Sequence, residues 1–367
     1  MNRYVKRKLK GLFCLAAASA AVIGTMAAVP RPDPETIALA AAAAASGRYP
    51  ADVPPDDIPE TSPAADLSFT PVSYGKISRP SSADEESHIE NEENADDIPN
   101  DPSEDLGHIE RRTYGHASGD EYIDLPSGQI RNLTSLPNED VLAAAEKGAD
   151  FTLTADGSVQ VMIMHTHTTE CFEPSPSDTY DSSRPCRTQD LSQNMAAVGD
   201  KIAEELEKAG IGVVHDVTLH DYPSYNGSYE RSAVTVADAL EKYPNIKIVL
   251  DIHRDAIETE DGLRVAPVAE INGKNAAQLM IICGADDGTM DMPDYLKNLG
   301  FAADLQQSLE NAAEGITRPI LFDYRRYNQD LTTGSLLIEV GSHGNSLDEA
   351  LYSGEIIGKA LASLAEK

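Results

Sequence analysis

The chain has 367 residues, of which 41% are hydrophobic and 25% are charged, and its formal net charge at pH 7 is -32. This length exceeds the roughly 250 to 300 residues at which single cores stop growing, so length alone allows two domains. The way the composition changes along the chain instead indicates a single folded domain. The negative charge excludes a nucleic-acid-binding protein, because phosphate binders need clustered Lys and Arg on one face.

Residues 1–30 have the pattern of an export signal, with a basic flank followed by an uncharged, largely apolar run from Gly11 to Val29. This run is close to the roughly 18 to 20 residues that span a bilayer. We therefore predict a single-pass signal anchor in the cell membrane, with the rest of the chain outside the cytoplasm. The run ends in small residues that resemble a signal-peptidase site, so secretion after cleavage is the alternative.

Residues 31–120 are rich in Ala, Pro, Ser, Asp and Glu, and Asp84 to Asp97 contains eight acidic residues and no Lys or Arg. Such a segment buries too little apolar surface to offset the entropy lost on ordering. We predict a disordered linker here.

Residues 121–367 have the patterns of a globular domain in which strands and helices alternate. Continuous apolar runs of strand length are typical of strands buried on both faces. An Asn272-Gly273 turn predicts a hairpin, and Ser346 with Glu349 forms a capping box for the last helix. The predicted strands are Val159–Met164, Ile211–Val217, Ile246–Ile252, a pair around Asn272-Gly273, Pro319–Tyr324 and Ser335–Val340, and the predicted helices are Leu191–Ala209, Ser228–Tyr243, Asp294–Glu314 and Leu347–Ala365.

This alternation predicts an α/β fold with a mostly parallel or mixed central sheet and helices on both faces. Ligands of such sheets bind beyond the carboxyl ends of the strands. Polar residues gather at these ends in the sequence. They are His165 and His167 after the first strand, Asp251, His253, Arg254 and Asp255 around the end of the third, and Glu339 near the end of the last.

These residue types suit a catalytic zinc site, which needs three ligands from His, Asp and Glu and one position open to water. His167-x-x-Glu170 supplies a closely spaced pair, and His253 supplies a distant third ligand. Glu339 then remains as a carboxylate that can move a proton. Each motif alone also fits polar residues where a strand meets solvent, and only their joint occurrence favours the metal site.

His165 leaves the ligand set open. Side chains alternate along a strand, so His165 and His167 are expected on the same face, and either could reach a metal. The spacing to Glu170 favours His167.

The cysteines do not form a disulfide scaffold. Cys14 lies in the apolar N-terminal run, and Cys283 lies in an apolar strand, where a buried thiol is expected. Cys171 and Cys186 flank a loop, and the sequence leaves open a disulfide between them in an oxidising compartment.

Four segments, in this order behind the N-terminal anchor and spacer, resemble the stage II sporulation protein P family of endospore-forming bacteria. They are "MHTHTTECF", "YERSAVTVADAL", "IVLDIHRDA" and "LLIEVGSHGNSLDEAL". The resemblance covers roughly residues 120 to 367, and Cys171 departs from it where a small polar residue is expected.

The resemblance implies a zinc-dependent cell-wall hydrolase with an amidase- or zinc-carboxypeptidase-like fold. Its substrate would be peptidoglycan, at the amide between N-acetylmuramic acid and L-alanine and also at stem-peptide cross-links. It implies action in engulfment with the sporulation proteins D and M. The implied zinc ligands are His165 or His167, Glu170 and His253, the catalytic carboxylate is Glu339, and Arg254 and Asp255 would hold ligands or substrate.

Two other functions remain open at this point. A zinc carboxypeptidase or endopeptidase uses a similar ligand pattern, and Arg254 would then bind the terminal carboxylate. A non-catalytic peptidoglycan-binding anchor would not require the predicted ligands and Glu339 to be intact together.

Overall fold

The structure is a computed structural model, and it describes residues 106–366. The predicted anchor and most of the predicted linker lie outside these residues. The described helices are α3 (Asn138–Ala145), α4 (Met195–Lys208), α5 (Ser228–Lys242), α6 (Tyr295–Ala312) and α7 (Leu347–Ser363). The described strands are β1 (Leu106–Arg112), β2 (Tyr122–Asp124), β3 (Gln129–Asn132), β4 (Leu153–Thr154), β5 (Val159–Met164), β6 (Thr179–Asp181), β7 (Gly212–His215), β8 (Ile248–Asp255), β9 (Arg264–Ile271), β10 (Lys274–Ala277), β11 (Leu279–Ala285), β12 (Ile320–Tyr324), β13 (Gly334–Ser342) and β14 (Ala365–Glu366).

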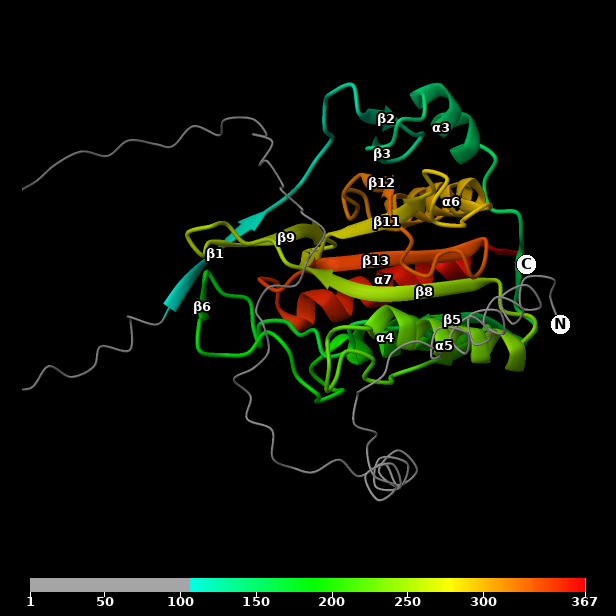
Figure 1. Cartoon of the computed structure of the whole chain (residues 1–367). Coiled ribbons are helices and arrows are strands. Elements are labelled where there is room, and N and C mark those ends of the chain that lie inside the picture. Colours follow the sequence, from blue (N-terminus) through cyan, green and yellow to red (C-terminus); the bar gives the residue numbers. More distant parts are fainter. Residues whose placement is uncertain (1–105, 367) are drawn as a thin grey trace, which may run out of the picture. The chain divides into compact units, whose positions relative to one another are not determined.

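The central element is an eight-stranded mixed sheet with the order β2-β3-β12-β11-β13-β8-β5-β7. The strands β13, β8, β5 and β7 are parallel to one another. β11 is antiparallel to β13 and parallel to β12. The carboxyl ends of β5, β8 and β13 therefore lie at the same edge as the start of β11 and β12 (Figure 1).

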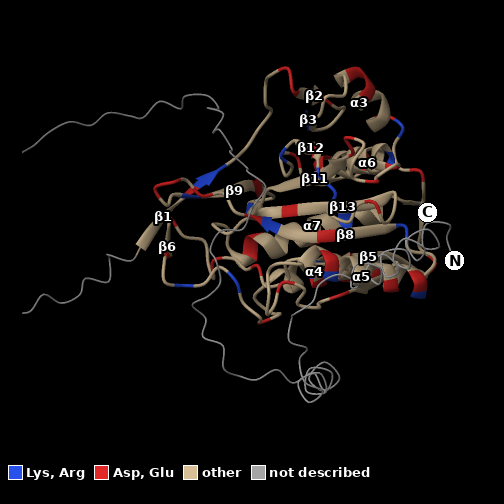
Figure 2. Cartoon of the chain, viewed as in Figure 1, with Lys and Arg blue, Asp and Glu red and all other residues tan. Residues whose placement is uncertain are grey.

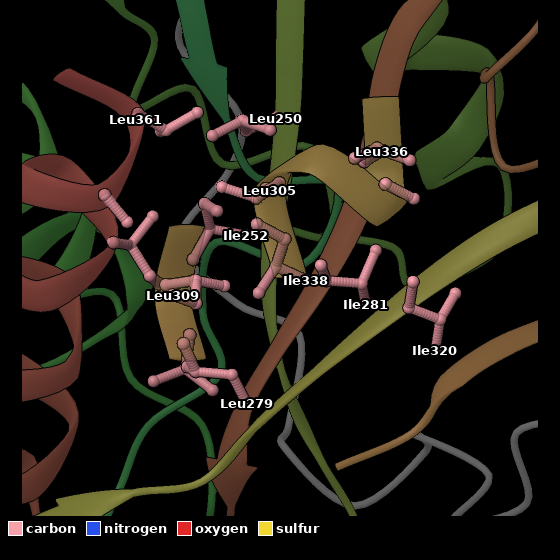
Figure 3. Packing of buried hydrophobic residues seen from close by; sticks show 14 of the residues in the cluster. Leu250, Ile252, Leu279, Ile281, Leu305, Leu309, Ile320, Leu336, Ile338 and Leu361 are labelled. Carbon is pink, nitrogen blue, oxygen red and sulfur yellow. The ribbon is translucent and has the colours of Figure 1, made fainter. Parts of the chain in front are cut away.

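Helices cover both faces of this sheet. On one face, Val161 and Ile163 of β5 share a buried apolar cluster with residues of α4, α6 and α7. Figure 3 shows part of this cluster, in which Ile252 and Ile338 of neighbouring strands pack against leucines of α6. On the other face, Met162 and Met164 pack with Val236 of α5. The predicted α/β fold with a mixed, doubly covered sheet is confirmed.

Most predicted elements occur within a few residues of the predicted bounds. β5 has the predicted bounds, and α4 begins four residues later than predicted, at Met195, because the Asn194 side chain caps it by accepting from Ala196 N. β8 extends past the predicted end at Ile252, so His253 lies inside the strand. This extension is possible because β13 also continues, to Ser342, and pairs with β8 as far as Asp255.

A second sheet is absent from the sequence prediction. It has four strands in the order β10-β9-β1-β6. β1 lies inside the predicted linker, so the prediction of disorder is wrong for Leu106–Arg112. In this strand only Ile109 is buried, next to charged residues, and the strand is held by pairing with β9. The Asn272-Gly273 hairpin is confirmed, with both residues at positive φ. The run that follows it divides between β10 and β11, one in each sheet.

No helix within residues 106–366 has the length and apolar character needed to cross a bilayer.

Helix α7 begins at the predicted capping box. Ser346 Oγ accepts a hydrogen bond from Glu349 N (3.4 Å), and Glu349 Oε2 accepts one from Ser346 N (3.0 Å). Glu349 also pairs with Arg111 of β1 and accepts from Asn345 Nδ2. The cap therefore joins α7 to the second sheet.

Replacing Ser346 with Ala is expected to lower the free energy of unfolding by about 1 kcal/mol, because the N-terminal amides of α7 lose an acceptor. Urea unfolding measures this loss. Ser224→Ala serves as the control, since Ser224 is exposed and its hydroxyl donates only to the backbone carbonyl of Asn226. Equal stability of Ser346→Ala and the control would contradict the role of the cap.

Candidate active site

The segment His165–Glu170 follows β5 and forms a turn that brings polar side chains over the sheet edge. Its threonines fix the turn. Thr166 donates through its backbone N and its Oγ1 to the buried carboxylate of Asp251 in β8, at 2.8 and 2.6 Å. Thr169 Oγ1 donates to Asp221 Oδ2 at 2.6 Å. The turn is thus attached on both sides of His167.

The structure brings His167, Glu170 and His253 together. The rings of His167 and His253 have centroids 5.3 Å apart, and His253 Nδ1 lies 3.6 Å from Glu170 Oε2. All three residues are buried. His167 also stacks on Tyr225, with centroids 4.4 Å apart, and meets Tyr229 edge-on.

The histidine nitrogens differ in their partners. His253 Nε2 lies 2.7 Å from Asp251 Oδ1, which orients the ring so that Nδ1 faces Glu170. His167 Nδ1 is buried and has no hydrogen-bond partner, since Asp221 Oδ2 lies 3.9 Å away. A buried nitrogen without a partner is costly in a folded protein, which makes it a candidate ligand atom.

Burial and neighbouring charges set the protonation of these groups. Burial lowers the pKa of His167 to about 3, which keeps its ring neutral. Burial also opposes ionisation of Glu170, but Arg254 and Arg187 outweigh it and lower the pKa of Glu170 to about 2. For His253, burial opposes the charge, while Asp251 and Glu170 raise its pKa to about 9.

Glu339 lies beside His253, because the two residues are paired in the parallel ladder of β13 and β8. Paired positions of neighbouring strands project to the same face of the sheet. Burial, and then the negative charge of Asp255, raises the pKa of Glu339. Its Oε2 atom is buried without a hydrogen-bond partner. Figure 2 shows the acidic residues on these two neighbouring strands.

Arg254 and Asp255 have separate contacts. Arg254 is buried, and its backbone N donates to Glu170 Oε2 (3.2 Å), while Nε and Nη2 donate to the carbonyls of Cys171 and Cys186. Asp255 pairs with Arg318 at 3.0 Å. Arg254 therefore holds Glu170, and Asp255 faces a different partner.

His165 has other partners than the remaining predicted ligands. The strand ends at Met164, so the alternation expected to place His165 and His167 on one face does not continue through the turn. His165 is fully buried, with Nδ1 2.9 Å from Ile252 O and Nε2 2.9 Å from His215 Nε2. Both of its ring nitrogens therefore have partners, and the ring lies between the sheet and α4.

Several residues of the site carry no assigned role in the sequence analysis. Asp251 lies two residues before His253 on the same strand face, and this spacing is the sequence signal that marks it as a partner of that ring. The other residues come from loops and from α5, and no spacing pattern links them to His167. They are Arg187, Asp221, Tyr225, Tyr229 and Arg318. Cys171 and Cys186 are free thiols, and Cys171 N donates to Cys186 O at 3.2 Å.

Within residues 106–366, no group of three or more His, Cys, Asp or Glu side chains has the arrangement of a metal site.

A family model described as Stage II sporulation protein P matches residues 70–362. The chain belongs to the stage II sporulation protein P family. Stage II sporulation protein P of Bacillus subtilis (strain 168) is 31% identical over 218 residues, which cover 56% of this chain and 50% of that protein. The chain thus matches about half the length of this curated relative.

This member of the stage II sporulation protein P family is also similar to solved structures. N-acetylmuramoyl-L-alanine amidase AmiC2 of Nostoc punctiforme is 15% identical with a TM-score of 0.33, covering 56% of this chain and 93% of that chain. The CwlD amidase of Clostridioides difficile, solved in complex with the GerS lipoprotein, has the same identity and coverage and a TM-score of 0.32. Because these identities and TM-scores are low, only the residues of this chain bear on its reaction.

The position of His165 predicts how stability depends on pH. Burial, and then the charge of His215, lowers the folded-state pKa of His165 to about 3, whereas an unfolded histidine titrates near 6.5. Between these values the unfolded chain binds a proton that the folded chain does not, so stability falls as the pH falls. From pH 7 to pH 5 this loss is about 2 kcal/mol.

Urea unfolding at both pH values tests this expectation. His165→Gln should lose less stability over the same interval than the wild type, and His108→Gln, at an exposed position of β1, should behave as the wild type does. Identical pH dependence in all three proteins would contradict the assignment.

Proposed function

We propose that this chain is a zinc-dependent peptidoglycan hydrolase that cleaves the amide between N-acetylmuramic acid and L-alanine. The observation that carries the proposal is the meeting of His167, Glu170, His253 and Glu339 at one sheet edge of a stage II sporulation protein P family member. Action on stem-peptide cross-links as well is part of the proposal.

The proposed zinc ligands are His167, Glu170 and His253. Two imidazole nitrogens and a carboxylate are the donor set of many catalytic zinc sites. Zinc binding would release the proton that Asp251 and Glu170 favour on His253. The unpartnered His167 Nδ1 supports this choice, as does the pairing of His253 Nε2 with Asp251, because a carboxylate behind a ligating histidine is a common arrangement. His165 is not proposed, since both of its nitrogens have partners.

Zinc bound by this set would polarise the scissile carbonyl and lower the pKa of a water molecule. Glu339 supplies the proton transfer: its carboxylate accepts a proton from the attacking water and returns it to the departing amine. The raised pKa of Glu339 suits this exchange, because a group with a pKa nearer neutrality both accepts and releases protons readily. The attack needs no covalent enzyme intermediate.

The neighbouring residues hold these groups in position. Asp251 joins the turn that bears His167 to the ring of His253. Arg254 fixes Glu170 and so keeps it ionised. Their removal would displace the proposed ligands without removing one.

The biological setting is proposed from family membership. We propose a role in engulfment during sporulation, with the sporulation proteins D and M as partners. The apolar run of the N-terminal segment supports a membrane anchor that holds the catalytic domain outside the cytoplasm, with secretion as the alternative.

A zinc carboxypeptidase needs an arginine for the terminal carboxylate, and Arg254 is engaged by Glu170 and two backbone carbonyls. This observation argues against Arg254 as the group that binds a terminal carboxylate. Mass spectrometry of digested muropeptides separates the two activities, because an amidase frees whole stem peptides and a peptidase shortens or separates them.

Glu339→Gln is expected to lower the rate of peptide release from purified sacculi by roughly a hundredfold or more, because the amide cannot take the proton. Release of free amino groups measures the rate. Glu314→Gln, an exposed position, should retain wild-type activity. Full activity of Glu339→Gln, or loss of activity only where the variant is unfolded, would contradict the catalytic role of Glu339. If the protein is a non-catalytic anchor, the wild type will release no peptide.

Metal content gives a test that does not depend on activity. The purified full-length protein is expected to hold about one zinc ion per chain, which a chelator removes and added zinc restores. His167→Ala and His253→Ala should each lose zinc, whereas His165→Gln should retain it. Elemental analysis measures the content, and zinc loss in His165→Gln without loss in His167→Ala would reverse the choice of ligand.

A further inference from the structure

Arg318, two residues before β12, has an unusual set of contacts. The residue is 4% exposed, and its Nη1 donates to Asp255 Oδ2 at 3.0 Å. Its Nε and Nη2 atoms are buried and have no hydrogen-bond partner. A guanidinium is always charged and has five N–H donors, so two buried nitrogens without acceptors leave a strong site for an anion.

The strand order places this guanidinium at the proposed active site. β11 and β13 lie between β12 and β8, so the ion pair from Arg318 to Asp255 passes over the end of β13. Glu339 lies on that part of β13, and its Oε2 is buried without a hydrogen-bond partner, as is Nδ1 of His343 just after β13. The charge of Arg318 acts on the pKa of Glu339 and lowers it, against the larger effect of burial.

Two carboxylates beside Arg318 keep some exposure to solvent. Glu339 is partly exposed, and the Asp255 side chain is 12% exposed. A ligand that reaches Glu339 from outside therefore approaches Arg318, and contact with its buried Nε and Nη2 requires a shift of the side chains that cover them.

The other arginines of the site have no comparable capacity. Arg254 donates to Cys171 O and Cys186 O and lies near Glu170. Arg187 donates to Asp221, Thr169 and Glu170. Arg318 uses one nitrogen of its three.

We propose that Arg318 binds a carboxylate of the substrate's stem peptide and thereby fixes the scissile amide relative to Glu339. This inference rests on the proposed function, because it takes the peptide of peptidoglycan as the ligand. Stem peptides carry carboxylates on side chains and at a free C-terminus, and a guanidinium fork binds such a group through two parallel N–H bonds. Arg318 is thus a specificity-determining residue.

A positioning role differs from this one in a measurable way. If Arg318 only adjusts the charge of Glu339, its loss lowers kcat for all substrates and leaves peptide affinity unchanged. If it binds a carboxylate, its loss weakens the peptide that carries the carboxylate and leaves the matching carboxamide unaffected.

The test uses the full-length protein loaded with zinc and the reaction product, so that no turnover is needed. Calorimetry measures the Kd of L-Ala-γ-D-Glu-diaminopimelate and of the forms in which one carboxylate at a time is a carboxamide. These forms distinguish the internal carboxylates from the C-terminal one. Arg318→Met removes the guanidinium, and Arg318→Lys keeps the charge opposite Asp255 but lacks the fork. Arg326→Lys, at an exposed arginine paired with Asp330, is the matched control.

We expect one carboxamide to bind the wild type roughly tenfold to a hundredfold more weakly than the free acid. Arg318→Met should weaken the free acid by a similar factor and should bind that carboxamide as the wild type does. The affinity of Arg318→Lys for the free acid should lie between the affinities of the wild type and Arg318→Met. Arg326→Lys should bind every peptide as the wild type does. Equal binding of all peptides by the wild type, or equal weakening of all peptides in both Arg318 variants, would overturn the inference.

The same proteins separate this inference from the proposed function. Absence of peptide release from sacculi by the wild type contradicts the hydrolase, whereas the affinity differences among peptides report on Arg318 alone.

Discussion

The carboxylate of Asp251 is the contact on which the site depends. It accepts two hydrogen bonds from Thr166 and one from the ring of His253, and it is buried in β8. An ionised carboxylate at this depth is stable only if its acceptor positions are filled, so the turn after β5 and the His253 ring are held together. Because His167 and Glu170 lie on that turn, one buried charge sets the distance between residues that are far apart in the sequence.

The charge balance around this carboxylate explains the opposite pKa shifts at the site. Arg254 and Arg187 keep Glu170 ionised, and the two carboxylates near His253 favour its cation. Glu339 lies next to Asp255 with little solvent and therefore holds its proton more tightly than an ordinary glutamate. The site thus contains one carboxylate suited to bind a cation and one suited to exchange a proton.

The sequence predicts the central sheet well, because β5, β8 and β13 are buried on both faces and appear as apolar runs that end in polar residues. It does not predict the second sheet, since β1 and β6 are short and charged and are held by strands distant in sequence. The proposed choice of His167 over His165 depends on where β5 ends. Strand periodicity cannot give that, because the turn is fixed by Thr166 bonding to Asp251 and not by local preference.

Arg318 is a candidate site residue that the search for polar residues at the carboxyl ends of strands does not find. In a purely parallel sheet, only residues that follow strands reach the ligand-binding edge. Here β11 runs against β13, so the edge also receives the residues that precede β11 and β12. Arg318 precedes β12 and shares no motif with His167 or His253. Because β11 and β12 run against β13, the guanidinium of Arg318 lies at the same edge as Asp255 and pairs with it. Candidate site residues in mixed sheets must therefore be sought before the antiparallel strands as well as after the parallel ones.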